Sequence, residues 1–273
     1  MTEPADRAGG ASLVTMPAAL LAMHAGPRPL ILPNVWDPVS ARAFAEAGFG
    51  ALATSSSAVA ATLGYTDGET PGELMLAAVA RIARSVTIPV TADVETGYGL
   101  VPAELVARLI ETGVAGCNLE DSDRASGLLT EPEKQADFLA AVRAEAGAEL
   151  VINARVDVYV RHPGGADSMN DRAEGQRATD DTIARANRYL AAGADCAYPI
   201  LAPANAMGEL VRRIQGPVNA LFRPGGLTLA DLAGLGVARI TFGGGLHARA
   251  AQAVQDMAVA LAADAAARPA SEA

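Results

Sequence analysis

Lysine is almost absent from this chain of 273 residues: Lys134 is the only one, and the other basic residues are arginines. Enzymes that form a Schiff base with their substrate or with pyridoxal phosphate need a lysine amine in the active site. Lys134 lies in TEPEKQADFLAAVRAEAG, which has the pattern of a surface helix. The sequence therefore argues against both enzyme classes.

Cysteine and histidine are also scarce. Cys117 and Cys196 belong to no CxxC or mixed Cys/His array, which argues against a structural zinc site. A reducing cytoplasm is the expected environment, although the two cysteines could pair, and Cys117 is expected to pack inward rather than act as a nucleophile. His24, His162 and His247 form no recognisable arrangement with a serine and an aspartate, so a Ser-His-Asp triad has no support.

Clusters of positive charge and long apolar runs are missing as well. The net charge is −10 and the pI about 4.8, which argues against binding to nucleic acid. The start, MTEPADRAGG, lacks the apolar region of a secretory signal, and no run approaches the roughly 18 apolar residues of a membrane span. We expect a single cytoplasmic domain over residues 1–273, with a short N-terminal extension and a C-terminal tail, that contacts no membrane.

What the chain does have is a regular alternation of short apolar runs and longer helical patterns. Four segments repeat the order helix end, glycine, buried strand: AEAGFGALATS, IETGVAGCNLE, LAAGADCAYPI and AGLGVARITFG. The candidate strands span residues 29–35, 50–55, 87–93, 115–120, 149–155, 195–200, 217–222 and 238–243. Eight such units predict an α/β fold of the TIM (β/α)8 barrel type. The alternative, an open doubly wound sheet, is disfavoured because no Gly-rich phosphate turn follows the first strand.

Helix signals stand between these strands. Residues 102–113, bounded by a proline and a glycine, repeat apolar side chains at helical spacing. Residues 180–193 predict another helix, with Asp180 as its N-cap and Gly193 at its C-terminal cap. An Ala-rich helix is expected at about residues 246–265.

Acidic residues gather where the predicted strands end, which is where a TIM barrel carries its active site. Asp93 and Glu95 stand in VTADVETGYG at the end of the third strand, Glu120 ends the fourth, and Asp67 follows the second. Four carboxylates in one place repel each other unless a cation lies among them, and oxygen-only ligands favour Mg²⁺, with Mn²⁺ as the alternative. The other interpretation is that Asp93 and Glu120 merely cap the helices that follow.

Other polar residues follow neighbouring strands. Arg155 could clamp a carboxylate bidentately, or form a salt bridge with Asp157 or Glu120. Three consecutive serines after the second strand offer N–H groups and hydroxyls to an oxyanion, or serve as ordinary turn residues. They are Ser55, Ser56 and Ser57. The segment GGGLH after the last strand is either a phosphate-binding turn or a hinge for the last helix.

Taken together, these segments resemble a known family. TADVETGYG, followed by LIETGVAGCNLED and INARVDVYV, is similar to the phosphoenolpyruvate mutase/isocitrate lyase superfamily, as is the upstream LPNVWDPVSARAFAEAGFGALATSSSAVAATLGYTDGE. The resemblance covers about residues 30–245. It implies a TIM barrel whose last helix is exchanged with a neighbouring subunit, usually in a homotetramer.

The resemblance also implies a metal site. Asp93 would bind Mg²⁺ directly, whereas Glu95, Glu120 and Asp67 would bind it largely through water. Glu95 stands where the family usually has a second aspartate, and its extra methylene still allows it to reach a metal-bound water. Arg155, Asp67 and Glu120 are expected to take part in catalysis.

The implied substrate is a small carboxylate. Its carboxylate and oxo group would contact the metal, the amides near residues 55–57 and Arg155, and Tyr98 is expected to contact the substrate as well. The family chemistry passes through a pyruvate enolate or a close relative, because Mg²⁺ and amide donors stabilise the charge on the enolate oxygen.

One segment departs from the family. Family lyases carry a Lys-Lys/Arg-Cys-Gly-His loop whose cysteine transfers protons, whereas this chain reads EDSDRASGLLTEPEKQ after the fourth strand. The difference argues against authentic isocitrate or methylisocitrate lyase activity. It leaves the proton donor open among Asp121, Ser122 and Tyr98.

Three functions are therefore weighed. The leading hypothesis is a Mg²⁺-dependent C–C lyase acting on a small 2-oxo or 2-hydroxy carboxylate. The second is a phosphorylmutase acting on phosphoenolpyruvate, phosphonopyruvate or carboxyvinyl-carboxyphosphonate, which needs extra cationic groups such as Arg124. The third is a barrel that binds a metal and a ligand without catalysis.

Overall fold

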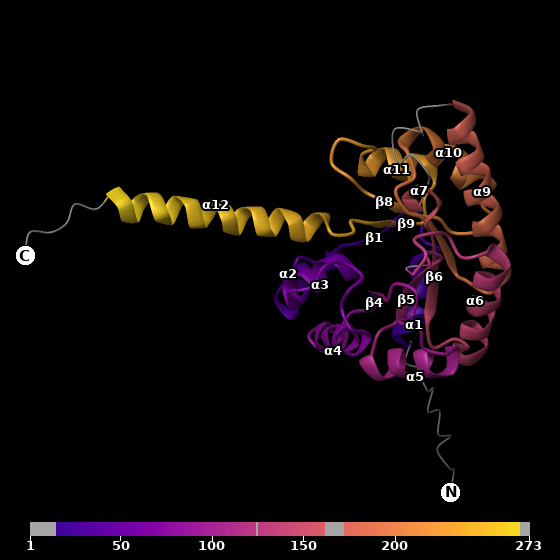
Figure 1. The fold of residues 1–273 in the computed structure, drawn as a ribbon, viewed down its shortest axis with the longest axis horizontal. Coiled ribbons are helices and arrows are strands. Elements are labelled where there is room, and N and C mark those ends of the chain that lie inside the picture. Colours follow the sequence, from indigo (N-terminus) through magenta and orange to yellow (C-terminus); the bar gives the residue numbers. More distant parts are fainter. Residues whose placement is uncertain (1–14, 124, 162–171, 268–273) are drawn as a thin grey trace, which may run out of the picture.

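Parallel strands and helices alternate along the chain, as the sequence predicts (Figure 1). The structure, a computed structural model, describes residues 15–123, 125–161 and 172–267, so Arg124 and His162 lie outside it. Every predicted strand region contains a strand. The strands are β1 (Leu30–Leu32), β2 (Asn34–Val35), β3 (Leu52–Thr54), β4 (Val90–Asp93), β5 (Gly116–Glu120), β6 (Val151–Val156), β7 (Cys196–Pro199), β8 (Asn219–Leu221) and β9 (Arg239–Thr241).

The strand pairings run around a ring. β2, β3, β4, β5, β6 and β7 pair in that order, and β1, β9 and β8 form a second parallel ladder. The ladders join at two places: Ala197 of β7 bridges to Val218 beside β8, and β1 and β2 are two parts of one predicted strand. Pro33 separates these parts because it has no N–H, while its carbonyl still accepts a hydrogen bond from Ala53 at 3.0 Å. This is the strand order of a TIM barrel.

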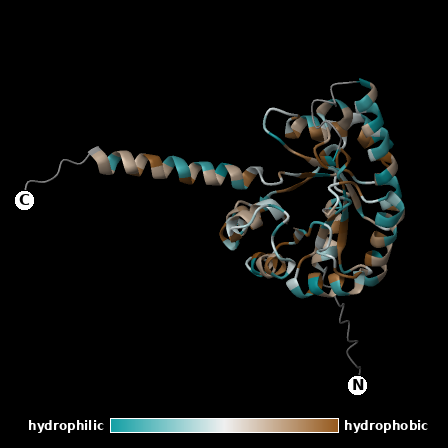
Figure 2. Ribbon diagram, viewed as in Figure 1, coloured by the Kyte–Doolittle hydropathy of each residue, from teal (hydrophilic) through white to brown (hydrophobic). Residues whose placement is uncertain are grey.

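The helices are α1 (Met16–Met23), α2 (Pro38–Glu46), α3 (Ser56–Leu63), α4 (Gly72–Ala83), α5 (Pro102–Thr112), α6 (Pro132–Ala146), α7 (Val158–Arg161), α9 (Arg172–Ala191), α10 (Ala204–Arg213), α11 (Leu229–Leu235) and α12 (Gly245–Ala267). Helices such as α4, α5, α6 and α9 lie around the strands, with apolar and polar residues mixed along them (Figure 2). Their buried apolar side chains form one core with those of the strands. None of the described helices is both long and apolar enough to cross a membrane.

The predicted start of α9 is wrong. Asp180 lies inside the helix and does not cap its N-terminus. Its carboxylate forms an ion pair with Arg213 at 2.7 Å. The helix extends further because Ala178 and Thr179, which precede Asp180, are buried on its inner face. Gly193, just beyond the helix, has the positive φ of 102° expected at a helix end.

Apolar side chains close the N-terminal end of the barrel. Leu20 of α1 is fully buried and belongs to one cluster with Leu32 of β1, Ala115 just before β5, and Val151 of β6. Further along the strands the inward positions become polar, with Asn118 and Asn153 among them. A functional site is therefore expected at the opposite, carboxyl end of the strands.

The last helix projects away from the barrel (Figure 1). From residue 251 to residue 266 its side chains are exposed, including the apolar Val254, Met257, Val259 and Leu261. Only its base contacts the barrel closely: the ring of His247 packs edge-on against Trp36, with 5.1 Å between the ring centroids. An apolar helix in this position needs a covering surface that the described chain does not supply.

Candidate active site

A cavity of about 310 Å³ lies at the carboxyl ends of the strands. Its wall includes five polar positions expected from the sequence, together with Arg155: Ser55, Ser56, Ser57, Asp67 and Asp93. It also includes polar residues that were not expected: Asn34, Asn118, Tyr198, Arg223 and Thr241. The strand ends thus bring together residues that are far apart in the sequence.

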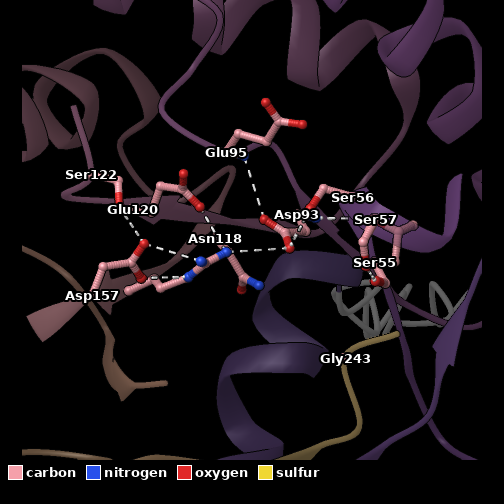
Figure 3. A network of polar contacts seen from close by, with 12 residues as sticks. Ser55, Ser56, Ser57, Asp93, Glu95, Asn118, Glu120, Ser122, Asp157 and Gly243 are labelled. Carbon is pink, nitrogen blue, oxygen red and sulfur yellow. Dashed lines mark hydrogen bonds and ion pairs between the residues drawn. The ribbon is translucent and has the colours of Figure 1, made fainter. Parts of the chain in front are cut away.

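Asp93 is held firmly at the end of β4. Its main-chain N–H donates to the hydroxyl of Thr54 on the adjacent strand at 3.0 Å. Its carboxylate accepts hydrogen bonds from the Ser56 hydroxyl at 3.2 Å and from the Glu95 N–H at 3.4 Å (Figure 3). The carboxylate is therefore oriented before any ligand binds, and it does not cap a helix.

The turn after Asp93 has an unusual backbone. Glu95 and Tyr98 have φ values of 56° and 58°, in the left-handed region that side chains rarely adopt, and Gly97 and Gly99 share it. In Figure 3 the Glu95 carboxylate is turned away from Asp93. Neither Glu95 nor Tyr98 lines the cavity, and the Tyr98 ring packs against Gly72 instead. Sequence spacing alone does not reveal such a turn.

Arg155 is surrounded by carboxylates. Its Nε and Nη2 donate to the two oxygens of Asp157 at 2.6 and 3.0 Å, and its Nη1 lies 2.7 Å from Glu120 and 3.9 Å from Asp93. Burial opposes the charge, but these three carboxylates outweigh it and raise the pKa of the guanidinium. The salt bridges considered from the sequence are both formed, and the guanidinium still lines the cavity.

A buried polar network supports Asp157 from behind. Asp157 accepts a hydrogen bond from the Ser122 hydroxyl at 2.5 Å and donates its N–H to Asp121 at 2.8 Å. Asp121 also accepts from the Tyr189 hydroxyl at 2.7 Å and from Arg185 at 3.1 Å. Asp121 and Ser122, two of the candidate proton donors, therefore belong to this support and do not line the cavity.

The segment that differs from the family lyases folds into a short hairpin. Ser122 and Leu129 form an antiparallel bridge, and the Asp123 N–H donates to the Leu128 carbonyl at 2.7 Å. Glu120, at its start, lines a second cavity of about 330 Å³ between the hairpin and α6. Lys134 lines this second cavity as well.

The serines and the glycine turn approach each other across the cavity. Ser55 caps α3 by accepting the Ala58 N–H at 3.4 Å, and its hydroxyl lies 3.0 Å from that of Ser57. A side chain at Gly244 would come within 2.9 Å of the Ser57 hydroxyl, so this close approach requires glycine. Next to it, Asn34 accepts the N–H groups of Phe242 and Gly243 at 2.7 and 3.0 Å.

The residues present fit a hard divalent cation held partly through water. Asp67 and Asp93 line the same cavity, and hydroxyl and amide oxygens complete an oxygen-rich wall. Within the described ranges, however, no three His, Cys, Asp or Glu side chains lie close enough to hold an ion together. The expected convergence of four acids is thus only partial, because Glu95 and Glu120 do not line this cavity.

Two of the polar residues that were not expected carry a sequence signal. Asn118 lies two residues before Glu120, and Thr241 two residues after Arg239. Since side chains alternate along a strand, Asn118 points to the same side as Glu120, the last residue of β5, and Thr241, the last residue of β9, points to the same side as Arg239. Tyr198 pairs with Arg155 in the register, and burial raises the pKa of its hydroxyl to about 12.

Comparison with known proteins agrees with this fold. Residues 20–262 match the family model of phosphoenolpyruvate phosphomutase. An uncharacterized protein of Mycobacterium tuberculosis H37Rv is 36% identical over 236 residues, covering 84% of this chain and 85% of the relative. A Corynebacterium glutamicum protein named "Probable 2-methylisocitrate lyase 2" is 34% identical over 194 residues, covering 66% of this chain and 57% of the relative.

A solved structure gives the same picture. A protein from Burkholderia cenocepacia J2315, described as "a putative phosphonomutase", superimposes with a TM-score of 0.81 at 39% identity, covering 89% of this chain and 98% of the other. The chain belongs to the phosphoenolpyruvate mutase/isocitrate lyase superfamily. The family predicted from the sequence is thereby confirmed, and its relatives include both lyases and mutases.

Proposed function

We propose that this protein is a Mg²⁺-dependent C–C lyase acting on a small 2-oxo or 2-hydroxy carboxylate. The observation that carries the proposal is that Asp93, Asp67 and Arg155 line one cavity. The Asp93 carboxylate is oriented by hydrogen bonds, and the positively charged guanidinium of Arg155 lies 3.9 Å from it. The cavity volume of about 310 Å³ suits a small ligand. Mn²⁺ could replace Mg²⁺ in such an oxygen-rich site.

The residues divide the work as follows. Arg155 would bind the substrate carboxylate, and Asp93 would hold the cation, with Asp67 on the same wall reaching it largely through water. Glu120 would act through Arg155, 2.7 Å from its Nη1, whereas Glu95, turned away from Asp93, would need to rotate to contact a metal-bound water. Bound Mg²⁺ would neutralise negative charge that develops on the substrate oxygen. The N–H groups at residues 55–57 assist at that oxygen.

A proton must reach the carbon that is left with the electron pair when the C–C bond breaks. Tyr198 lines the cavity, and its hydroxyl carries a proton at neutral pH, as any tyrosine does. We assign it the role of donor ahead of Asp121, Ser122 and Tyr98, none of which lines the cavity. The proposal thus replaces the cysteine of the family loop with a group from β7.

The test is an assay of 2-oxo and 2-hydroxy acids with Mg²⁺, read as release of pyruvate or a related oxo acid. Activity that disappears on chelation and returns with Mg²⁺ is expected. A crystal soaked with Mg²⁺ and oxalate, an enolate mimic, should place oxalate between Asp93 and Arg155. Release that is unaffected by chelation, or oxalate bound elsewhere, would remove the proposal.

A phosphorylmutase is the second candidate. Arg223 and the glycines at residues 243–245 line the same cavity and could bind a phosphoryl group. Conversion of phosphonopyruvate to phosphoenolpyruvate, followed by ³¹P NMR, would favour the mutase over the lyase. Silence in both assays, with oxalate still bound, would indicate a barrel that binds ligand without catalysis.

We also propose a homotetramer in which α12 is exchanged between subunits. The support is the exposed apolar face of α12 and its distance from the barrel (Figure 1). We propose a cytoplasmic location, since Cys117 and Cys196 are free buried thiols, the state that a reducing compartment maintains.

A further inference from the structure

Arg239 on β9 carries a charge into the interior of the barrel. Its side chain is fully buried, and none of the described carboxylates lies within ion-pair distance of it. Burial lowers the pKa of its guanidinium. A buried charge of this kind costs folding free energy, so its presence calls for a physical reason.

Its position in the strand places it directly beneath the cavity. Arg239 pairs in the register with Leu30 and Asn219, whereas Thr241, two residues later, lines the cavity. Because side chains two residues apart point the same way, Arg239 occupies the inward layer below Thr241. Its charge therefore lies in the floor of the candidate active site.

Arg239 contacts the cavity wall through Asn118. Its Nη2 donates to Asn118 Oδ1 at 3.3 Å, and Asn153 Nδ2 donates to the same oxygen at 2.8 Å. A guanidinium can only donate, so the amide oxygen of Asn118 must face it. The Nδ2 of Asn118 is then directed to the other side, where the residue lines the cavity next to Asp93, its partner in the register.

We propose that Asn118 Nδ2 donates a hydrogen bond to a carboxylate oxygen of the bound ligand, and that Arg239 is the positioning residue that orients this amide and adds positive charge beneath it. The inference deepens the proposed function, on which it rests, by assigning a carboxylate contact to the cavity floor. It gives a physical reason for retaining a costly buried cation.

A purely structural role for Arg239 is less consistent with its contacts. Its Nε and Nη1 are buried without a hydrogen-bond partner among the described residues. Unpaired buried donors cost folding free energy, so the guanidinium contributes little to stability. A neutral side chain of similar size would fill the same space at lower cost. The two roles therefore predict opposite effects of neutral substitution on stability.

The test compares Arg239→Met, Arg239→Lys and Asn118→Asp with the wild-type protein and with Arg81→Gln, an exposed control on α4. Oxalate binding in the presence of Mg²⁺ is measured by calorimetry, and Tm by calorimetric scanning. We expect Arg239→Met to keep or raise Tm while weakening oxalate about tenfold or more, the range of a charge-assisted contact. Arg239→Lys should recover part of the affinity, because it keeps the charge.

Asn118→Asp keeps the acceptor that faces Arg239 but removes the donor, so it should weaken oxalate without unfolding the protein. A crystal of the wild-type complex should place Asn118 Nδ2 within hydrogen-bond distance of an oxalate oxygen. A lower Tm for Arg239→Met with unchanged oxalate affinity would overturn the inference and leave Arg239 a structural residue.

The two proposals can fail separately. Oxalate held by Asp93 and Arg155 but out of reach of Asn118 overturns the floor contact and leaves the lyase standing. Oxalate contacting Asn118 in a protein that cleaves no oxo or hydroxy acid supports the floor contact and removes the lyase. A wild-type protein that binds no oxalate overturns both.

Discussion

The substrate carboxylate has a competitor for Arg155 within the site. Asp157 occupies Nε and Nη2, and Glu120 lies 2.7 Å from Nη1, the atom nearest to Asp93. A substrate carboxylate that approaches Nη1 would have to compete with Glu120. A cation that attracts Glu120 through water weakens that competition, so metal and carboxylate substrate should favour each other's binding.

Asp93 is the residue on which the metal proposal depends. Asp93→Asn keeps the size and part of the hydrogen bonding but removes the charge, so we expect kcat to fall by about 10²-fold or more and Mg²⁺-dependent oxalate binding to weaken. Calorimetry and the cleavage assay measure the two effects. Glu111→Gln, on the exposed side of α5, is the control and should change neither.

Tyr198 offers a separate test of proton transfer. Tyr198→Phe removes only a hydroxyl, so the fold and oxalate binding should persist while kcat falls about 10²-fold, the range for a lost general acid. Steady-state kinetics with any active substrate measures the change. An unchanged kcat would assign the proton to another group.

Asp121 predicts a pH dependence of stability. Burial raises the pKa of this carboxyl above its ordinary 3.8, so its contribution is greatest when it is protonated and is lost as the pH rises through its folded pKa. Asp121→Asn cannot ionise and should gain stability relative to wild type between about pH 4 and pH 7. Urea unfolding at both pH values measures the difference; a shift in the other direction would mean that the ion pair with Arg185 dominates.

At the scale of elements, the turn after β4 differs most from what spacing alone suggests. Gly97 has a φ of 87°, and an added Cβ would lie 2.9 Å from Leu105 of α5. The turn is thus fixed both by its backbone conformation and by contact with the next helix. Glu95 and Tyr98 adopt left-handed conformations within it, which is how their side chains come to point away from the cavity.

Two alanine substitutions separate these constraints. Gly97→Ala should cost about 2–4 kcal/mol of unfolding free energy, because it combines left-handed strain with overpacking. Gly99→Ala, with a φ of 73° and no atom within 4 Å of the added Cβ, should cost only about 1–2 kcal/mol. Urea unfolding compares them, and equal costs would show that Leu105 yields freely.

The strands could be predicted from the sequence, whereas the polar side chains inside the barrel could not. Short apolar runs, four of them preceded by a helix end and a glycine, predicted all eight strand regions because they reflect local turn chemistry and burial. Asn118 and Arg239 were missed, since a shift of one residue in register would send either side chain to the opposite face. The helix start assigned to Asp180 was wrong because a capping residue alone does not exclude an earlier start.

At the scale of the whole molecule, the proposed assembly depends on α12. Leu261→Glu places a charge on its exposed apolar surface, so we expect the proposed tetramer to dissociate while the helix content by circular dichroism stays the same. Light scattering after size exclusion gives the mass. Gln255→Glu introduces the same charge at a polar position of the helix and should keep the oligomer; a wild-type monomer would contradict the assembly.

Asn34 links the helix proposed for subunit assembly, α12, to the wall of the ligand cavity. One amide oxygen accepts both N–H groups of residues 242 and 243, and these lead into the base of α12, while the same side chain forms part of the cavity wall. If a neighbouring subunit binds α12, a displacement of that helix would reach the ligand through Asn34 and through residues 242–245, which also line the cavity. Turnover per subunit would then decline on dilution, before any loss of fold, so the proposed activity would depend on protein concentration.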